Sequence, residues 1–216
     1  MEKSQIGISG FALKWIAIIT MGIDHIGAVL YPQYIILRII GRISFPIFCF
    51  LLVEGVLHTH NIRKYIKRLF LFALISELPF DLAFYGKIML QHQNVFFTLC
   101  AGVIMLAVLE YRRNNIDSLL VVIGTILLTE TVASDYGAGG ILIILCFYVL
   151  YRKHFLKQAA FAGVNLLYYG TGVQAYAGLA AVPLLFYNGK QGRSMKYFFY
   201  LFYPVHLLIL YLIIRL

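Results

Sequence analysis

The chain has 216 residues, of which 62% are hydrophobic and 12% are charged, and its mean hydropathy is +0.85. Soluble domains are about 45–50% apolar and about 25% charged, so this composition excludes an ordinary soluble domain. The formal net charge of +9 would suit a nucleic-acid-binding protein, but the basic residues mostly lie between apolar stretches. We therefore interpret the charge as a membrane-topology signal and expect no nucleic-acid partner.

The apolar stretches predict an all-α fold, a polytopic bundle of transmembrane helices that forms a single integral membrane domain over residues 1–216. A helix needs about 20 apolar residues to cross a hydrocarbon core of about 30 Å, which gives about nine spans, with eight or ten as alternatives. Residues 1–10 lack the apolar core and cleavage site of a signal peptide, so we expect the first span to direct insertion. The predicted spans are 12–31, 35–57, 68–85, 94–110, 118–133, 138–151, 158–172, 175–188 and 197–214.

The distribution of lysine and arginine predicts the orientation of these spans. Cytoplasmic loops of membrane proteins are enriched in basic residues, and an N-in, C-out arrangement places most of them on that side. Only Lys87 and Arg215 would lie outside. The cytoplasmic set is Lys3, Lys14, Arg63, Lys64, Lys67, Arg68, Arg112, Arg113, Arg152, Lys153, Lys157, Lys190, Arg193 and Lys196.

Several ionisable residues lie inside the predicted spans. Such residues cost roughly 2.5–3.5 kcal/mol each at the bilayer centre and commonly mark a functional site. At about 1.5 Å per helical residue, four of them fall roughly 14–18 Å from the cytoplasmic face. These four are His25, Arg42, Glu77 and His206. We expect them to converge in one polar layer near mid-membrane.

The spacing of the charges predicts their partners. Arg38 and Arg42 are i,i+4 neighbours on one helix face, and Glu77 and Asp81 repeat this spacing on the next span. Because the two spans run antiparallel, we expect Arg42 to meet Glu77 and Arg38 to meet Asp81. Asp24 points about 100° away from His25 around the helix, so we expect it to contact Arg42 or another helix. The alternatives are that the arginine–carboxylate pairs are a purely structural clamp and that His25 is a packing histidine.

Two further groups of polar residues lie near the membrane surfaces. The outer group is a rim of Gln91, Gln93, Asn94, Glu130, Asp135 and Tyr136. The inner group contains His58, His60, Arg63, Lys64, Lys67 and Arg68. Topology and lipid headgroups explain the inner group, and binding of a phosphorylated donor such as coenzyme A is the alternative. No metal-binding motif such as H-E-x-x-H occurs, and we expect no metal site.

Short motifs along nearly the whole chain resemble TraX-like proteins. They are Leu13–Ala17, Met21–Gly27, Gly41–Pro46, Glu54–Gly55, Ser76–Asp81, Asn94–Leu99, Asp135–Gly137 and Tyr203–Leu207. TraX proteins are known as acetylases of the N-terminus of a conjugative pilin. The apolar helix from Lys14 to His25 also looks like the opening of the acyltransferase-3 group, whose members move acyl groups from a cytoplasmic donor to acceptors outside.

The resemblance and the polar layer together predict a membrane acyltransferase of the bacterial cytoplasmic membrane. Its donor would be acetyl-CoA or another acyl-CoA. Its acceptor would be an extracytoplasmic protein amine, or a hydroxyl of a surface glycan or lipid. The alternatives are a small proton-coupled transporter and a non-catalytic factor for assembly of a surface structure.

Roles follow for the residues singled out above. His25 is expected to act as the general base, with His206 as an alternative base near a kink at Pro204. Arg42 would stabilise negative charge, and Asp24 and Glu77 would orient these groups or relay a proton. We expect Arg38, Asp81, Asn94, Asp135 and Tyr203 to contact the substrate, and Arg63, Lys64, Lys67 and Arg68 to bind the donor.

Overall fold

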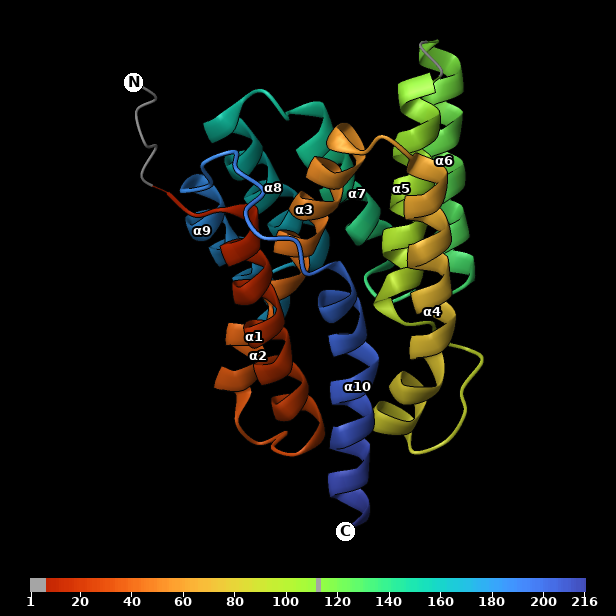
Figure 1. The fold of residues 1–216 in the computed structure, drawn as a ribbon, viewed down its shortest axis with the longest axis vertical. Coiled ribbons are helices and arrows are strands. Elements are labelled where there is room, and N and C mark those ends of the chain that lie inside the picture. The colour runs from red at the N-terminus through yellow and green to blue at the C-terminus, as the bar shows by residue number, and fades with distance from the viewer. Residues whose placement is uncertain (1–6, 112–113) are drawn as a thin grey trace.

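The computed structural model describes residues 7–111 and 114–216, and this part of the chain is built from helices and loops (Figure 1). The predicted positions Lys3, Arg112 and Arg113 lie outside the described residues. The helices are α1 (Gly10–Val29), α2 (Ile35–Gly41), α3 (Ser44–His58), α4 (Ile62–Tyr85), α5 (Val95–Tyr111), α6 (Asn115–Thr131), α7 (Gly137–Val149), α8 (His154–Tyr169), the 3-10 helix η1 (Val173–Ala180), α9 (Ala181–Leu185) and α10 (Lys196–Arg215). The all-α prediction is confirmed.

Two of the predicted spans are interrupted. The second divides into α2 and α3 at Arg42 and Ile43, four residues before Pro46. Proline has no N–H to donate to the carbonyl four residues earlier, and its ring crowds that carbonyl, so the helix breaks there. The eighth begins as η1 and continues as α9, after Gly170 and Gly172. Within the described residues, three segments are long and apolar enough to cross a membrane: Gly10–Val29, Ile35–His58 and Lys196–Arg215.

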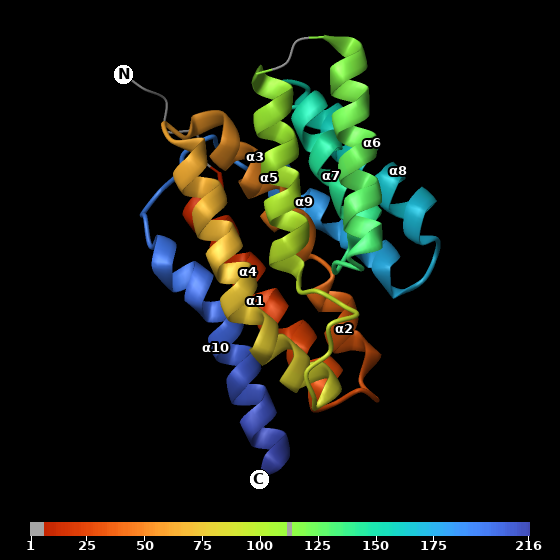
Figure 2. The same ribbon diagram turned by 90° about the vertical axis from the view of Figure 1, so that its right-hand side faces the viewer.

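The helices pack so that the two ends of the chain share one layer. The last helix, α10, returns to lie between α1 and α4 and contacts both of them (Figure 1). Helix α4 packs mainly on α10 and α5, whereas α1 packs mainly on α2 and α3. The view turned by 90° shows that α5, α6, α7 and α8 pack together on the side of α4 that faces away from α10 (Figure 2). Residues that are distant in sequence, on α1 and α10, therefore become neighbours.

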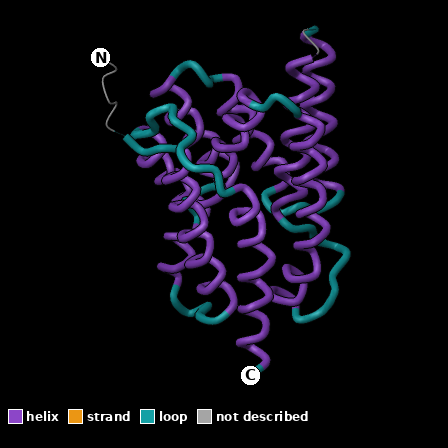
Figure 3. Tube along the Cα trace, in the orientation of Figure 1, coloured by secondary structure: helices purple, strands orange, loops and turns teal. Residues whose placement is uncertain are grey.

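Several loops lie at two opposite ends of the bundle, and others lie between these ends (Figure 3). One end holds the α3–α4, α7–α8 and α9–α10 connections, together with the beginning of α1. The opposite end holds the 30–34 and 86–94 loops and the C-terminus. At the first end, Ile8 N–H donates to the Phe186 carbonyl at 2.7 Å, and Asn188 N–H donates to the Ile8 carbonyl at 3.0 Å. These bonds join the segment before α1 to the loop before α10.

A glycine allows α1 and α2 to approach closely. A Cβ atom built on Gly41 would overlap the Cβ and carboxyl group of Asp24. On the facing helix, a Cβ on Gly27 would lie 2.6 Å from the Leu37 Cβ. Only glycine therefore fits at Gly41 without moving the Asp24 side chain, which lies in the polar layer described next.

Candidate active site

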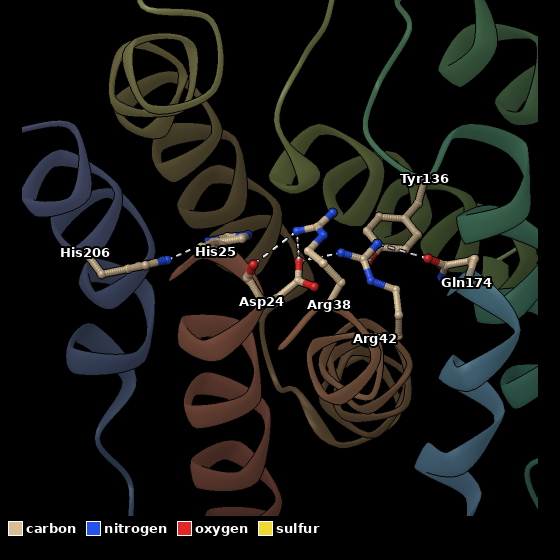
Figure 4. Close-up of polar contacts among 7 residues, drawn as sticks. All are labelled: Asp24, His25, Arg38, Arg42, Tyr136, Gln174 and His206. Carbon is tan, nitrogen blue, oxygen red and sulfur yellow. Dashed lines mark hydrogen bonds and ion pairs between the residues drawn. The ribbon is translucent and has the colours of Figure 1, made fainter. Parts of the chain in front are cut away.

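Two histidines from the first and last helices meet inside the bundle. The distance between His25 Nδ1 and His206 Nε2 is 2.6 Å, and the two imidazole planes are 6° apart with centroids at 4.9 Å. The predicted convergence of these two positions, which are 181 residues apart, is confirmed. Figure 4 shows that they begin a row of polar side chains that continues through the arginines to Gln174.

The hydrogen bonds of His206 fix the tautomers of both rings. His206 Nδ1 lies 2.6 Å from the Phe202 carbonyl oxygen, which can only accept, so Nδ1 carries the proton. In neutral His206 the Nε2 atom is then an acceptor, and His25 Nδ1 must donate to it. This assignment leaves Nε2 of neutral His25 with a free lone pair, as a general base requires.

Asp24 is the partner of both arginines. The carboxylate is buried and accepts a hydrogen bond from Arg38 Nη1 at 2.8 Å and another from Arg42 Nη2. Arg38 Nη1 also donates to the Asp24 carbonyl oxygen at 3.1 Å. The expected contact between Asp24 and Arg42 is confirmed. Asp24 therefore joins α1 to both arginines of the second predicted span.

The predicted pairs of Arg42 with Glu77 and of Arg38 with Asp81 are wrong. Helix α2 packs on α1, whereas α4 packs mainly on α5 and α10, so the acidic residues of α4 lie beside other partners. Equal depth does not fix which helices are neighbours.

The acidic residues of α4 bind backbone groups around the start of α5. Glu77 accepts hydrogen bonds from the N–H of Asn94, at 3.2 Å, and from its side-chain amide. Asn94 Oδ1 in turn accepts from Phe96 N–H at 3.0 Å, and Asp81 accepts from Met89 N–H at 2.8 Å. Glu77, Asp81 and Asn94 do not line the cavity described below. This geometry supports a structural clamp, and the functional roles of these three residues stay predictions.

The far side of Arg42 is held by residues that the sequence did not single out for this purpose. Arg42 Nη1 donates to Gln174 Oε1 at 3.0 Å and to the Tyr136 hydroxyl at 3.4 Å. Gln174 lies in η1, and its backbone carbonyl accepts from Asn165 Nδ2 of α8 at 2.9 Å. Among the described residues, Arg42 Nε and Gln174 Nε2 are buried without a hydrogen-bond partner. Both atoms are donors at the end of the row that is farthest from the histidines.

A cavity of about 710 Å³ runs beside the row of polar side chains. Its central wall includes Asp24, His25, Arg38, Arg42 and Tyr203. Towards the end of the bundle that holds the start of α1, the wall includes Lys14, His58, His60, Arg68 and Lys196. Towards the opposite end it includes Tyr85, His92 and Asp135. One cavity therefore connects a basic region to His25 and to the predicted outer rim.

Asp135 lies in the loop between α6 and α7, next to this cavity. Burial raises the pKa of its carboxyl group above the ordinary value, while the charge of nearby Arg42 opposes that shift. The backbone carbonyl of Asp135 accepts a hydrogen bond from the Thr98 hydroxyl, which fixes the loop against α5. A role of Asp135 in binding substrate stays a prediction.

The basic residues predicted to bind the donor divide into two groups. Arg68 lines the cavity and lies over the rings of Tyr65 and Tyr200, with centroid distances of 5.4 and 5.3 Å. Arg63, Lys64 and Lys67 are exposed and do not line it. Lys14 and Lys196, which the sequence indicated only as topology signals, join Arg68 at the wall. The two lysines share this wall because the starts of α1 and α10 pack near each other.

These features define a helical membrane protein in which histidine, arginine and aspartate side chains meet beside an internal cavity. The TraX protein family matches residues 9–214, and the chain belongs to this family. The chain is 32% identical to a probable fimbrial assembly protein, FimC of serogroup H1, from Dichelobacter nodosus, over 95% of this chain and 96% of that protein. A segment of 38 residues, 18% of this chain and 15% of the relative, is 63% identical to an uncharacterised protein of Rickettsia prowazekii (strain Madrid E). No solved structure matches the chain.

Proposed function

We propose that the protein is a membrane-embedded acyltransferase that moves an acyl group, first of all acetyl, from cytoplasmic acyl-CoA to an acceptor on the opposite side. The acceptor is a protein amine or a hydroxyl of a surface glycan or lipid. The observation that carries the proposal is the His25–His206 pair beside a cavity with a basic end. The association of TraX proteins with pilin acetylation and the fimbrial name of the Dichelobacter relative support it.

The proposal includes a membrane topology. The chain crosses the bacterial cytoplasmic membrane about nine times, with its N-terminus inside and its C-terminus outside. In support, the α3–α4, α7–α8 and α9–α10 connections lie at one end of the bundle, beside the start of α1. Arg63, Arg152 and Lys190 lie in or beside these connections. Single cysteines introduced at exposed positions Lys153 and Lys87 test the topology, because only the second should react with an impermeant maleimide in intact cells.

The cavity has properties that suit an acyl-CoA donor. Its volume lies within the range of about 300–1,000 Å³ that is usual for small-molecule sites. Lys14, Arg68 and Lys196 at the basic end can pair with phosphate groups, which bind most strongly to positively charged donors. Arg42 lines the cavity, its Nε is a buried donor without a partner among the described residues, and a bound carbonyl oxygen would satisfy it. Acyl-CoA, when bound, supplies an activated thioester.

Each side chain of the site has a separate role in acyl transfer. His25 Nε2 takes the proton from the acceptor hydroxyl or amine as that atom forms a bond to the carbonyl carbon. Arg42 stabilises the negative charge that develops on the carbonyl oxygen, and Asp24 holds Arg42 in place. His25 returns the proton to the sulfur as the carbon–sulfur bond breaks, so the products are the acylated acceptor and the free thiol. His206 orients His25 and stabilises its protonated form.

A second function is supported by the printed name of the Dichelobacter relative. A non-catalytic assembly factor for a surface fibre would need the same bundle, with the row of polar side chains acting only as an internal clamp. The two functions differ in whether acyl-CoA is consumed.

The test uses purified full-length protein in liposomes, acetyl-CoA labelled in its acetyl group, and an envelope fraction from cells that lack the protein. The proposal expects label to enter a protein, glycan or lipid of that fraction. It also expects Lys14→Glu and Lys196→Glu to raise the KM for acetyl-CoA, because each replaces an attraction for phosphate by a repulsion. The exposed residue Lys64 gives the matched control, since Lys64→Glu lies outside the cavity. Fibre assembly without any consumption of acetyl-CoA would instead support the assembly factor.

A further inference from the structure

The imidazole of His25 is enclosed by aromatic rings from two other helices. Phe84 of α4 meets it edge-on, with a centroid distance of 5.4 Å and an interplanar angle of 88°. Tyr203 of α10 meets it at 5.8 Å and 71°. Aromatic rings at such separations are in direct contact. The base therefore has an aromatic boundary on two sides, formed by Phe84 and Tyr203.

A second row of rings supports this boundary from behind. Phe80 packs on Phe84 at 5.1 Å, and Phe96 packs on Tyr203 at 5.3 Å. All four rings line the cavity. We call Phe80, Phe84, Phe96 and Tyr203 the aromatic wall. Phe80, Phe96 and Tyr203 are buried, and because protein interiors are closely packed, the wall cannot move outward without disturbing several helices.

The geometry of transfer places the acyl group against this wall. A general base works within about 2.6–3.2 Å of the atom that it deprotonates. That atom must in turn lie about 3–3.5 Å from the carbonyl carbon that it attacks. The carbonyl carbon is thus confined near His25, and any carbons beyond it have to fit in the space that the aromatic wall leaves.

We propose that the aromatic wall limits the donor to short acyl groups and that Phe84 sets the length limit. This inference rests on the proposed acyltransferase function. Phe84 is half-buried, whereas the other three members of the wall are buried, so shortening its side chain opens space while its neighbours keep their packing. A longer acyl chain in the native protein has to displace a packed ring. In apolar pockets each extra methylene changes the specificity constant by about 10- to 200-fold.

The experiment compares acetyl-, butyryl- and hexanoyl-CoA as donors for the purified full-length protein in liposomes. Free thiol release is measured in the presence and absence of the envelope acceptor fraction. The variants are Phe84→Ala, the milder Phe84→Leu, and Phe70→Ala as a matched control. Phe70 also lies on α4, but it is 49% exposed and does not line the cavity.

The expected result is a kcat/KM for acetyl-CoA at least about tenfold above that for hexanoyl-CoA in the native protein. This ratio should fall at least about tenfold in Phe84→Ala, fall less in Phe84→Leu, and stay unchanged in Phe70→Ala. Equal kcat/KM values for hexanoyl-CoA and acetyl-CoA in the native protein overturn the proposal. So do Phe84 variants that lose acetyl transfer or keep it without any gain for the longer donors. A native protein that transfers none of the three acyl groups overturns the proposed function itself.

Discussion

Asp24 on α1 holds Arg42, which lies immediately after α2, and the same carboxylate oxygen also accepts from Arg38 at 2.8 Å. The arginine side chains are 13% and 28% exposed, respectively, and both form their ion pair with this carboxylate. Removing one partner of a buried ion pair costs about 3–5 kcal/mol, because a charge is left buried without compensation.

Asp24→Asn should therefore lower the free energy of unfolding by an amount near the lower end of that range, since Arg38 is partly exposed. Thermal unfolding in detergent measures the change. The double variant Asp24→Asn with Arg42→Gln removes both charges of the most buried pair. Its loss of unfolding free energy should be smaller than the sum of the losses in the two single variants. Additive effects would contradict the pairing.

Gly41 is the position where α1 and α2 come closest. Alanine favours helices over glycine by about 0.8–1.0 kcal/mol, so Gly41→Ala in an open position would stabilise the protein. Here a Cβ atom would overlap the Asp24 side chain, and we expect Gly41→Ala to lower both the unfolding temperature and the rate of transfer.

The control for this change is Gly124→Ala on α6, where nothing lies within 4 Å of the new Cβ. That variant should be as stable as the native protein or slightly more stable. A Gly41→Ala protein that behaves like the Gly124→Ala control would show that the close approach of α1 and α2 is unnecessary.

Gln174 accepts a hydrogen bond from Arg42 at 3.0 Å and is expected to position that guanidinium for charge stabilisation. Gln174→Leu removes the acceptor, and we expect kcat to fall roughly tenfold while the KM for acetyl-CoA stays nearly constant, as the loss of one hydrogen bond to a charged group suggests. Gln174→Glu keeps the acceptor but adds a negative charge beside Arg42.

The Gln174→Glu variant separates a catalytic contribution from a structural one. It should unfold at a temperature near that of the native protein but retain a reduced kcat, because its carboxylate competes with the developing oxyanion for the charge of Arg42. Full recovery of kcat in Gln174→Glu would indicate that Gln174 only supports the fold.

His206 is expected to orient His25 and not to act as the base itself, because its Nδ1 is bound to the Phe202 carbonyl and its Nε2 to His25. His206→Ala should therefore reduce kcat less than His25→Ala does. His206→Gln, which can still offer an acceptor to His25 Nδ1, should recover part of the loss. Equal and complete loss in His206→Ala and His206→Gln would instead favour His206 as the base.

The sequence predicted the fold class and the meeting of His25 with His206 for a simple physical reason. The rise of a helix converts distance along a span into depth, so residues at one depth can be identified without coordinates. The lateral arrangement follows from packing between helices that are distant in the chain. Spacing alone therefore gave wrong partners for Arg42 and Arg38, which bind Asp24 in place of Glu77 and Asp81.

The residues that the sequence missed lie where regular helices end. Gln174 belongs to η1, which follows the Gly170–Gly172 break, and an isolated glutamine beside glycines carries no pattern that indicates a partner. The break itself is a usable signal, because irregular backbone inside a membrane is tolerated where it is buried in protein or lines a cavity. Lys14 and Lys196 were visible in the sequence, but their common position depends on the contact between α1 and α10.

The most direct test of the central claim is transfer of labelled acetyl groups from acetyl-CoA to the envelope fraction by the native protein and by His25→Ala, both purified and reconstituted in liposomes. We predict transfer by the native protein and a decrease of about 10²- to 10⁴-fold in His25→Ala, which is the usual contribution of a general base. Circular dichroism and unfolding temperature confirm that the variant is folded. Undiminished transfer by a folded His25→Ala protein would contradict the assignment of His25 as the base of a membrane acyltransferase.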